Sequence, residues 1–316
     1  MKRKVLVTGG AGFVGSYLVQ KLLDEKFEVV VVDDLSNVSE YVPPEGVEFI
    51  KMDISIQNSL NRIPAYDFQC VFHLAAQSSN AISFFDPYKD VLVNQLGTLN
   101  VLNFVKERGI GKIVYSSSMS AYGAPSSIPT NEDVCLMPNS FYAVHKLAGE
   151  HYCRIFANEY HLDYTIFRFY TVYGHGQNLL NANQGLLSIY LSYIVSGKPI
   201  ILKGSKDRIR DIIHVTDVVD ALFLSMKNDS SKNKTYNLGT GNSYTIEYLI
   251  DLLTLEFGYG PGEYPIIIEG GTPGDPFETK ANMEKIKSDL NWMPKILAPE
   301  GIKLTVASYK PKHLRF

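Results

Sequence analysis

The feature that most constrains the fold is a glycine-rich turn near the N-terminus. The segment TGGAGFVG (residues 8–15) joins a short apolar run at 4–9 to a segment with helical periodicity at 13–26. At such a junction Gly9 permits a tight turn, and Gly12 lets a phosphate group approach the backbone at the start of the helix. A glycine-rich turn alone is equally compatible with an ordinary loop. The residues that follow it must therefore distinguish a phosphate-binding turn from a loop.

An acidic residue in the expected place favours a dinucleotide site over a simple turn. Asp33 ends the second apolar run, EVVVVDD (28–34), about 20 residues after the turn, where a carboxylate can bind ribose hydroxyls. A carboxylate there also repels a 2′-phosphate, so we expect NAD rather than NADP as cofactor. The alternative is that Asp33 is only a solvated strand end.

Short apolar runs alternate with helix-length segments through the first half of the chain. Runs that are apolar on both faces indicate a parallel sheet covered by helices on each side, which is a doubly wound Rossmann fold. The second half is richer in glycine, proline and polar residues and predicts a smaller α/β substrate domain. The predicted division is 1–174 with 212–236 for the NAD-binding domain, and 175–211 with 237–316 for the substrate domain.

A tyrosine and a lysine are spaced for proton chemistry. Tyr142 and Lys146 lie four residues apart, so a helix places them on one face. A neighbouring ammonium and a positive nicotinamide would lower the high pKa of the phenol and make it a usable base. Taken alone, this spacing is also common on ordinary exposed helix faces. Ser118 ends the strand-like run KIVYSSS, and ligands in such sheets bind beyond the carboxyl ends of strands.

Composition excludes several other classes of function. The 316 residues carry a formal net charge of -3, without basic runs, which argues against nucleic acid or an anionic membrane as partner. The three cysteines have no metal-like spacing, so we expect no metal site. The N-terminal apolar run is broken by Thr8 and two glycines, too early for a signal peptide or a membrane span, and we expect a cytoplasmic protein.

Together these motifs resemble the extended short-chain dehydrogenase/reductase superfamily, in particular its NAD-dependent nucleotide-sugar epimerases and dehydratases. The resemblance covers nearly the whole chain, through TGGAGFVG, HLAA (73–76), Asn94, SSSMSAYG, YAVHK, FRFYTVYG, RDIIHVTDVVDA, NLGTG, PGDP and LNWMPK. It implies a homodimer formed through helices around 91–108 and 142–160.

The resemblance also implies roles for individual residues. The implied catalytic residues are Ser118, Tyr142 and Lys146. The implied cofactor-binding residues are Gly9, Gly12, Phe13, Val14, Asp33, Asp53, Ile54, Leu74, Ala75, Ala76 and Asn94, together with Tyr142 and Lys146. The implied substrate-binding residues are Ser118, Met119, Ser120, Thr171, Arg210, Asp275 and Thr279, with Arg210 on the substrate diphosphate.

The two residues after Ser118 indicate the class of reaction. Dehydratases of this family place an Asp-Glu pair there, whereas this chain has Met119 and Ser120, which cannot exchange a proton at neutral pH. What remains is removal and return of hydride at one carbon, a nucleotide-sugar 4-epimerase. The alternatives are a 4,6-dehydratase, a 4-dehydrogenase or a 4-keto reductase of the same superfamily, and a non-enzymatic NAD-sensing scaffold.

Several positions bear on the substrate. Thr171 and Thr272 replace an Asn and an Arg that family members commonly use to bind diphosphate. Thr279, four residues after Asp275, stands where hexose-specific epimerases carry a bulky aromatic residue, and its small side chain predicts room for an N-acetyl group. The nucleotide, UDP, dTDP or GDP, stays open. We interpret His145 as a packing or surface residue.

Overall fold

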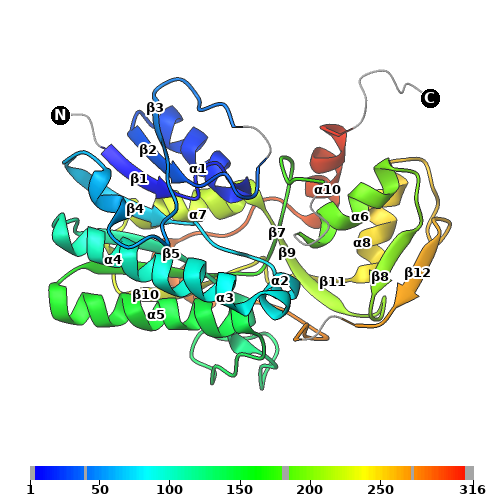
Figure 1. Ribbon diagram of the computed structural model, residues 1–316. Helices are drawn as coiled ribbons and strands as arrows, with labels where there is room; N and C mark the ends of the chain where they lie inside the picture. The colour runs from blue at the N-terminus through cyan, green and yellow to red at the C-terminus, as the bar shows by residue number, and fades with distance from the viewer. Residues whose placement is uncertain (1–3, 39–40, 180–184, 272–273, 310–316) are drawn as a thin grey trace.

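The computed structural model describes residues 4–38, 41–179, 185–271 and 274–309 (Figure 1). Its main sheet has seven parallel strands in the order β10-β6-β5-β4-β1-β2-β3. The strands are β1 (Lys4–Thr8), β2 (Glu28–Asp33), β3 (Val47–Lys51), β4 (Phe68–His73), β5 (Lys112–Ser118), β6 (Asp163–Phe169) and β10 (Lys234–Leu238). The chain moves outward from β1 to β3 and returns to β4 on the other side of β1, which confirms the doubly wound sheet.

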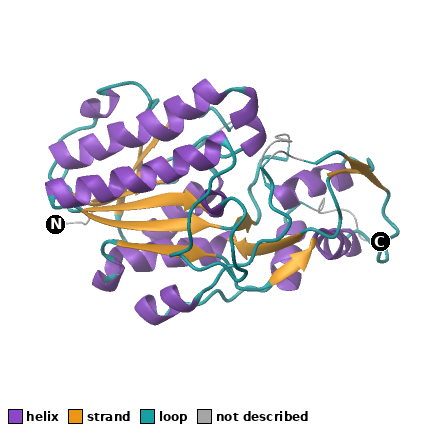
Figure 2. Ribbon diagram, turned by 90° about the horizontal axis from the view of Figure 1, so that it is seen from below, coloured by secondary structure: helices purple, strands orange, loops and turns teal. Residues whose placement is uncertain are grey.

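The strands are apolar on both faces because helices cover both. In β1, Val5 and Val7 are buried in one core, with residues of α1 (Phe13–Asp24), α7 (Val215–Lys227) and α9 (Glu284–Leu290). Leu6, between them, is buried in a second core with α4 (Gly97–Glu107) and α5 (Phe141–Tyr160). The alternation follows from the two-residue period of a strand. Figure 2 shows the helices on both sides of the sheet.

Two helices differ from the sequence prediction at their ends. The helix predicted over 13–26 ends at Asp24, because Lys26 adopts a left-handed backbone conformation with φ of 66°. The helix predicted over 91–108 begins as a π-helical segment, η2 (Val91–Leu96), before α4 continues it. Gly97 stands at this junction, where a Cβ atom would lie 2.9 Å from Cδ1 of Ile54. The glycine therefore lets this helix pack closely against Ile54.

The smaller α/β domain predicted from the sequence is present. It has a three-stranded sheet, ordered β11-β9-β7, and a two-stranded sheet, β12-β8, and a third apolar core. Its elements are β7 (Thr171–Tyr173), α6 (Leu186–Val195), β8 (Ile200–Lys203), β9 (Ile209–His214), β11 (Ser243–Thr245), α8 (Ile246–Leu255), β12 (Ile266–Glu269) and α10 (Ala298–Ala307). In Figure 1 it lies beside the carboxyl ends of the main strands.

Two segments cross the domain boundaries that the sequence suggested. β9 runs through the boundary at residue 212 without a break. α9 and Trp292, which fall within 237–316, pack into the core of the first domain rather than that of the second. The chain therefore passes between the two domains more often than the composition of its segments indicated.

The remaining short helices lie in the connections. They are η1 (Ser59–Arg62), α2 (Asn80–Phe85), α3 (Pro87–Asp90), η3 (Met119–Tyr122) and η4 (Asp229–Ser231). Across the described ranges, no helix combines the length and the apolar character needed to cross a bilayer.

Candidate active site

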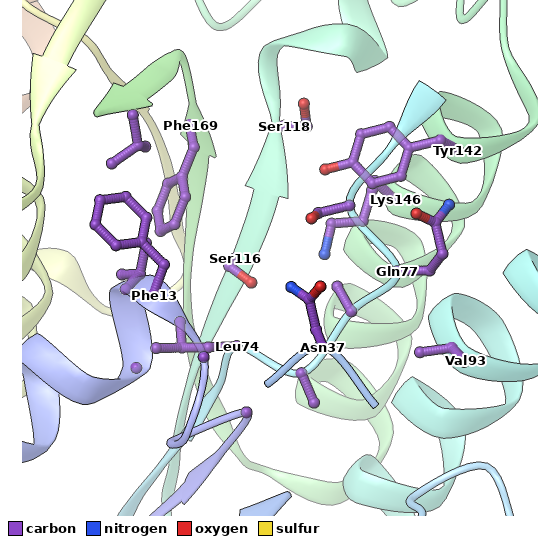
Figure 3. A pocket seen from close by; sticks show the side chains of 18 of the residues that line it. Phe13, Asn37, Leu74, Gln77, Val93, Ser116, Ser118, Tyr142, Lys146 and Phe169 are labelled. Atoms are coloured by element: carbon purple, nitrogen blue, oxygen red, sulfur yellow. The ribbon is translucent and has the colours of Figure 1, made fainter. Parts of the chain in front are cut away.

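A cleft of about 600 Å³ runs along the carboxyl ends of β1, β2, β4 and β5 and reaches the smaller domain. This is where a doubly wound sheet binds its ligands, next to the point at which the strand order reverses. Figure 3 shows part of its lining. Most of the residues that the sequence analysis singled out line this cleft.

The glycine turn has the shape that a pyrophosphate requires. Gly9 has φ of +73°, and a Cβ atom there would lie 2.5 Å from the backbone nitrogen of Ala75. A Cβ atom on Gly15 would lie 2.0 Å from the carbonyl oxygen of Gly9, so the first turn of α1 is held against β1. α1 starts at Phe13, and its N-cap residue is Gly12, which has no side chain to cap the helix. Its first N–H groups therefore face the cleft, where an anion is stabilised.

The predicted ribose acid lies next to this turn, at the carboxyl end of β2. Asp33 accepts hydrogen bonds from the backbone nitrogens of Ala11 (3.1 Å) and Leu35 (2.9 Å). Burial raises the pKa of its carboxyl group, although these two bonds act in the opposite direction. The other residues predicted to bind cofactor along this part of the cleft also line it: Phe13, Val14, Asp53, Ile54, Leu74, Ala75 and Ala76.

Ser118, Tyr142 and Lys146 meet at the far end of the cleft (Figure 3). Tyr142 and Lys146 lie in the first two turns of α5, which begins where Ser140 accepts a hydrogen bond from the backbone nitrogen of Ala143 (3.2 Å). Ser118 is the last residue of β5, and its hydroxyl lies near enough to the Tyr142 phenol to lower the pKa of that phenol. The predicted triad of side chains is therefore assembled in one place.

Close packing of α5 on β5 positions the lysine. A Cβ atom on Gly149 would lie 2.2 Å from the Tyr115 hydroxyl, so only a glycine allows this approach. The ammonium of Lys146 lies 4.9 Å from the centre of the Tyr115 ring. A cation over an aromatic face in a buried site is stabilised by the ring quadrupole.

The pKa values of Tyr142 and Lys146 differ from what the spacing of the two residues suggested. Burial raises the pKa of Tyr142 to about 12, and the nearby Ser118 hydroxyl only partly offsets this effect. Burial lowers the pKa of Lys146 to about 8, against the attraction of Asp90, Cys153 and Glu150. The protein alone therefore holds Tyr142 as a neutral phenol, and the lowering of its pKa that the spacing suggested is not found. A further positive charge must enter the site before the phenolate becomes accessible.

The substrate-side residues lie toward the smaller domain. Met119, Ser120, Thr171, Arg210 and Asp275 all line the cleft. The Arg210 guanidinium donates to Asp275 (2.8 Å) and to the carbonyl oxygens of residues 209 (2.8 Å) and 277 (3.0 Å). Arg208 also contacts Asp275. Two cations share one carboxylate, which leaves a net positive charge beside the cleft.

Two predicted site residues do not line the cleft. The amide of Asn94 is turned inward and bonds the backbone of Gln77 and the carboxylate of Asp90. Thr279 is buried and accepts a hydrogen bond from the backbone nitrogen of Asp211 (3.2 Å). Sequence spacing could not show which way these side chains face. Thr272 lies outside the described residues.

The cleft also contains residues that the sequence analysis missed. They include Asn37, Gln77, Asn80, Lys89, Tyr170 and Gln177. Gln77 could have been predicted from the sequence, because it follows directly after HLAA at the carboxyl end of a strand. Lys89 and Gln177 lie in segments without any motif, and only the folded chain brings them to the site.

Residues 5–239 match the NAD dependent epimerase/dehydratase family. The chain belongs to this family. UDP-glucose 4-epimerase of Mycolicibacterium smegmatis is 32% identical over 318 residues, which cover 98% of this chain and 99% of the relative. The resemblance inferred from the motifs, and with it an NAD-dependent enzyme, is confirmed.

Solved structures agree with this assignment. UDP-glucose 4-epimerase of Thermotoga maritima, crystallised with UDP-glucose, has a TM-score of 0.90 and 34% identity and covers 97% of this chain and 98% of its own. The complex of Thermus thermophilus UDP-glucose 4-epimerase with NAD has a TM-score of 0.89 and 31% identity, covering 98% and 99%. An NAD-dependent NDP-hexosamine 5,6-dehydratase is also similar, with a TM-score of 0.86 and 27% identity over 98% of each chain.

NAD is the cofactor, and the cleft fits it. The glycine cradle faces the uncapped start of α1, which suits a pyrophosphate, and Asp33 lies where a ribose would follow. When bound, NAD would supply a hydride acceptor at this site. The roles of the individual residues around it stay predictions.

Proposed function

We propose that this protein is a 4-epimerase of UDP-linked hexoses or N-acetylhexosamines. The observation that carries the proposal is the combination of Ser118, Tyr142 and Lys146 in one cleft with Met119 and Ser120 beside them. The three residues are equipped for oxidation of an alcohol. Neither Met119 nor Ser120 can act as a second acid or base, so elimination of water has no obvious catalyst.

In the proposed reaction Tyr142 takes the proton of the C4 hydroxyl while hydride leaves the same carbon. The Ser118 hydroxyl, which lies near the phenol, would bind the substrate oxygen in this proposal and so direct the path of the proton. Lys146 holds its positive charge next to the phenol and favours the phenolate form. After the 4-keto sugar turns in the cleft, Tyr142 returns the proton and hydride returns to the opposite face. Charge and atoms balance, because the product is an isomer of the substrate.

The diphosphate of the substrate, which lies away from the reacting C4 carbon, supplies binding energy and orientation. We assign its diphosphate to Arg210, whose planar guanidinium suits phosphate oxygens. The ion pair with Asp275 holds the guanidinium in place within the cleft wall. UDP is the proposed nucleotide, because the relatives and structural neighbours named above as UDP-glucose 4-epimerases match this chain over nearly its full length.

The decisive experiment follows isotope and product together. Purified protein is incubated in D₂O with UDP-glucose and, separately, with UDP-N-acetylglucosamine, and the products are identified by NMR and mass spectrometry. We expect a fixed ratio of 4-epimers, no added cofactor requirement and no deuterium on any ring carbon. A 4,6-dehydratase would lose water and incorporate deuterium, and its keto product would refute the proposal.

The same preparation tests the remaining alternatives. A 4-dehydrogenase or 4-keto reductase exchanges NAD with solvent and depends on added cofactor, whereas an epimerase returns the hydride and keeps its NAD. We expect NAD to co-purify with the protein. Net formation of NADH during turnover would favour a dehydrogenase.

We also propose a homodimer formed through the helices around 91–108 and 142–160. Apolar side chains are exposed there, among them Leu92, Leu96 and Val144, and α5 packs directly on η2. Val144→Glu should convert a dimer into a monomer in analytical ultracentrifugation. Leu255→Glu, on the outer face of α8, is the matched control and should leave the dimer intact. A wild-type monomer at micromolar concentration would refute this proposal.

A further inference from the structure

A buried polar cluster lies directly behind the catalytic pair. At its centre is Asp90, the last residue of α3, whose side chain is 0% exposed. One carboxylate oxygen, Oδ1, contacts Nδ1 of His145 at 2.6 Å and accepts from the Asn94 amide at 2.9 Å. The other, Oδ2, accepts from the Gln77 amide at 2.6 Å. Three separate segments of chain thus converge on one carboxylate.

The cluster touches the site from two sides. His145 is the residue before Lys146 in α5, and its side chain is buried although it adjoins the surface-facing Val144. Gln77 lines the cleft, and Figure 3 shows it on the same side as Tyr142 and Lys146. A shift of Asp90 would therefore move both a wall of the cleft and the turn of α5 that carries the lysine.

A buried carboxylate is expensive unless its charge has a purpose or a partner. Removing a carboxylate from water costs several kcal/mol, and neutral amide donors return only part of it. An amide at position 90 would fill the same space without that cost. The group in direct contact with this carboxylate is His145, and the negative charge also acts on the buried Lys146, whose pKa burial lowers while Asp90 raises it.

We propose that Asp90 is a positioning residue of this enzyme: held by His145 and Gln77, it fixes the Tyr142–Lys146 turn of α5 against the cleft and places a negative charge behind that turn. His145 holds the Asp90 carboxylate in place through Nδ1. Only the part of this inference that concerns catalysis rests on the proposed function. The charge on Lys146 itself can be measured without any substrate.

Other groups face Lys146 and must be weighed against Asp90. Glu150 and Cys153 lie on the same helix, and both favour the ammonium. Glu150, however, is engaged bidentately by Arg168, with both bonds at 2.8 Å. His73 in β4 is neutral, because burial and then Lys146 lower its pKa to about 3. Asp90 is thus the carboxylate near Lys146 that has no arginine bound to it among the described contacts.

Asp90 acts on Tyr142 in the same direction. Its negative charge adds to the effect of burial, which is the main reason that the pKa of the phenol lies near 12. Loss of the charge should therefore lower the pKa of both Tyr142 and Lys146. Both limbs of a bell-shaped pH–rate profile should then move to lower pH together. A purely structural defect would lower the height of the profile without moving its limbs.

The test is a titration of Lys146 by NMR in protein labelled at the lysine ε-carbon, with the resonance assigned from Lys146→Met. We expect titration near pH 8 in the wild type. In Asp90→Asn it should fall by about one unit, the usual effect of a neighbouring buried charge. Asp90→Ser removes the same charge without placing an amide against the donors, and serves if the first variant does not fold.

Two further variants separate charge from packing. Asp86→Asn neutralises the carboxylate at the other end of α3, which caps that helix at the Lys89 nitrogen (2.9 Å), and should leave Lys146 unchanged. His145→Asn keeps a donor for Asp90 and should retain the wild-type titration, whereas His145→Ala should lower kcat by about tenfold without loss of bound NAD.

An unchanged titration of Lys146 in folded Asp90→Asn and Asp90→Ser would overturn the proposal. So would an equal shift in Asp86→Asn. If Lys146 shifts as expected but the protein does not interconvert 4-epimers, the proposed function fails and the role of Asp90 stands. If the epimers interconvert but the titration of Lys146 is unchanged in the Asp90 variants, the proposed function stands and the role of Asp90 fails.

Discussion

Replacing Tyr142 by phenylalanine isolates the proton-transfer step. The ring stays in place, because the side chain is buried in α5 and only its hydroxyl group is removed. Ser118 keeps its hydrogen bond to the Ser120 hydroxyl at 3.1 Å and still accepts from the Ser120 nitrogen at 3.1 Å. No buried hydroxyl is left without a partner, so we expect the change in unfolding free energy to stay within about 0.5 kcal/mol.

The expected loss of activity follows from what else the cleft offers. General acid–base catalysis contributes on the order of 10²- to 10⁴-fold. Met119 and Ser120 cannot replace the phenol, and Lys146 is held as a cation, so we expect a fall in kcat of about 10³-fold. That corresponds to about 4 kcal/mol in activation free energy. The glycine turn and Asp33 are the predicted cofactor-binding residues and are unchanged in this variant, so we expect its NAD content to stay the same.

The assay measures epimer interconversion, NAD released on denaturation and thermal stability in the same preparation. Tyr152→Phe is the matched control, since it removes a phenol from the same helix at a position away from the cleft. We expect wild-type activity in that variant. A Tyr142→Phe enzyme that keeps more than about a tenth of the wild-type kcat would refute the base role. Loss of NAD with loss of activity would show instead that the phenol serves binding.

Three further predictions follow from the same contacts. Ser118→Ala should lower kcat by about 10²-fold with NAD retained, because a hydrogen bond is lost but the base remains; unchanged kcat would remove Ser118 from the proton path. Asp33→Ala should weaken NAD binding and reduce the preference over NADP by about tenfold or more, since the repulsive carboxylate is gone; unchanged selectivity in a cofactor-binding titration would place the ribose acid at another residue, Asp34 first. Arg168→Met should destabilise the fold by about 3 kcal/mol in urea unfolding, the lower end for a broken buried ion pair, because Glu150 loses its bidentate partner but keeps the bonds from Arg154 and Ser117. Burial alone would raise the pKa of Glu150, but the bonds from Arg168 and Ser117 hold it below its ordinary value, so the stability this pair contributes is present at neutral pH and is lost as pH falls through the folded-state pKa. The deficit of the variant should therefore shrink in acid, and a deficit that grows in acid would contradict this assignment.

Several features of the site were predictable because they depend on residues close together in the chain. The alternation of Val5, Leu6 and Val7 between two cores is fixed by the geometry of one strand. The turn at Gly9 and the uncapped start of α1 are likewise local. Tyr142 and Lys146 share a face of α5 through helical spacing alone. Order and spacing of such motifs then predicted the sheet, the cofactor and the family.

The tertiary structure decided which side chains reach the cleft and what surrounds them. Asn94 and Thr279 were expected at the site, but the first turns inward to Asp90 and the second to the backbone of Asp211. The contact between Asp90 and His145 joins residues 55 positions apart, and no local sequence pattern predicts it. Burial, which moves the pKa of both catalytic groups, likewise depends on how whole helices pack on the sheet. Periodicity within one element fixes neighbours on that element, whereas the environment of a side chain is set by the other elements that pack against it.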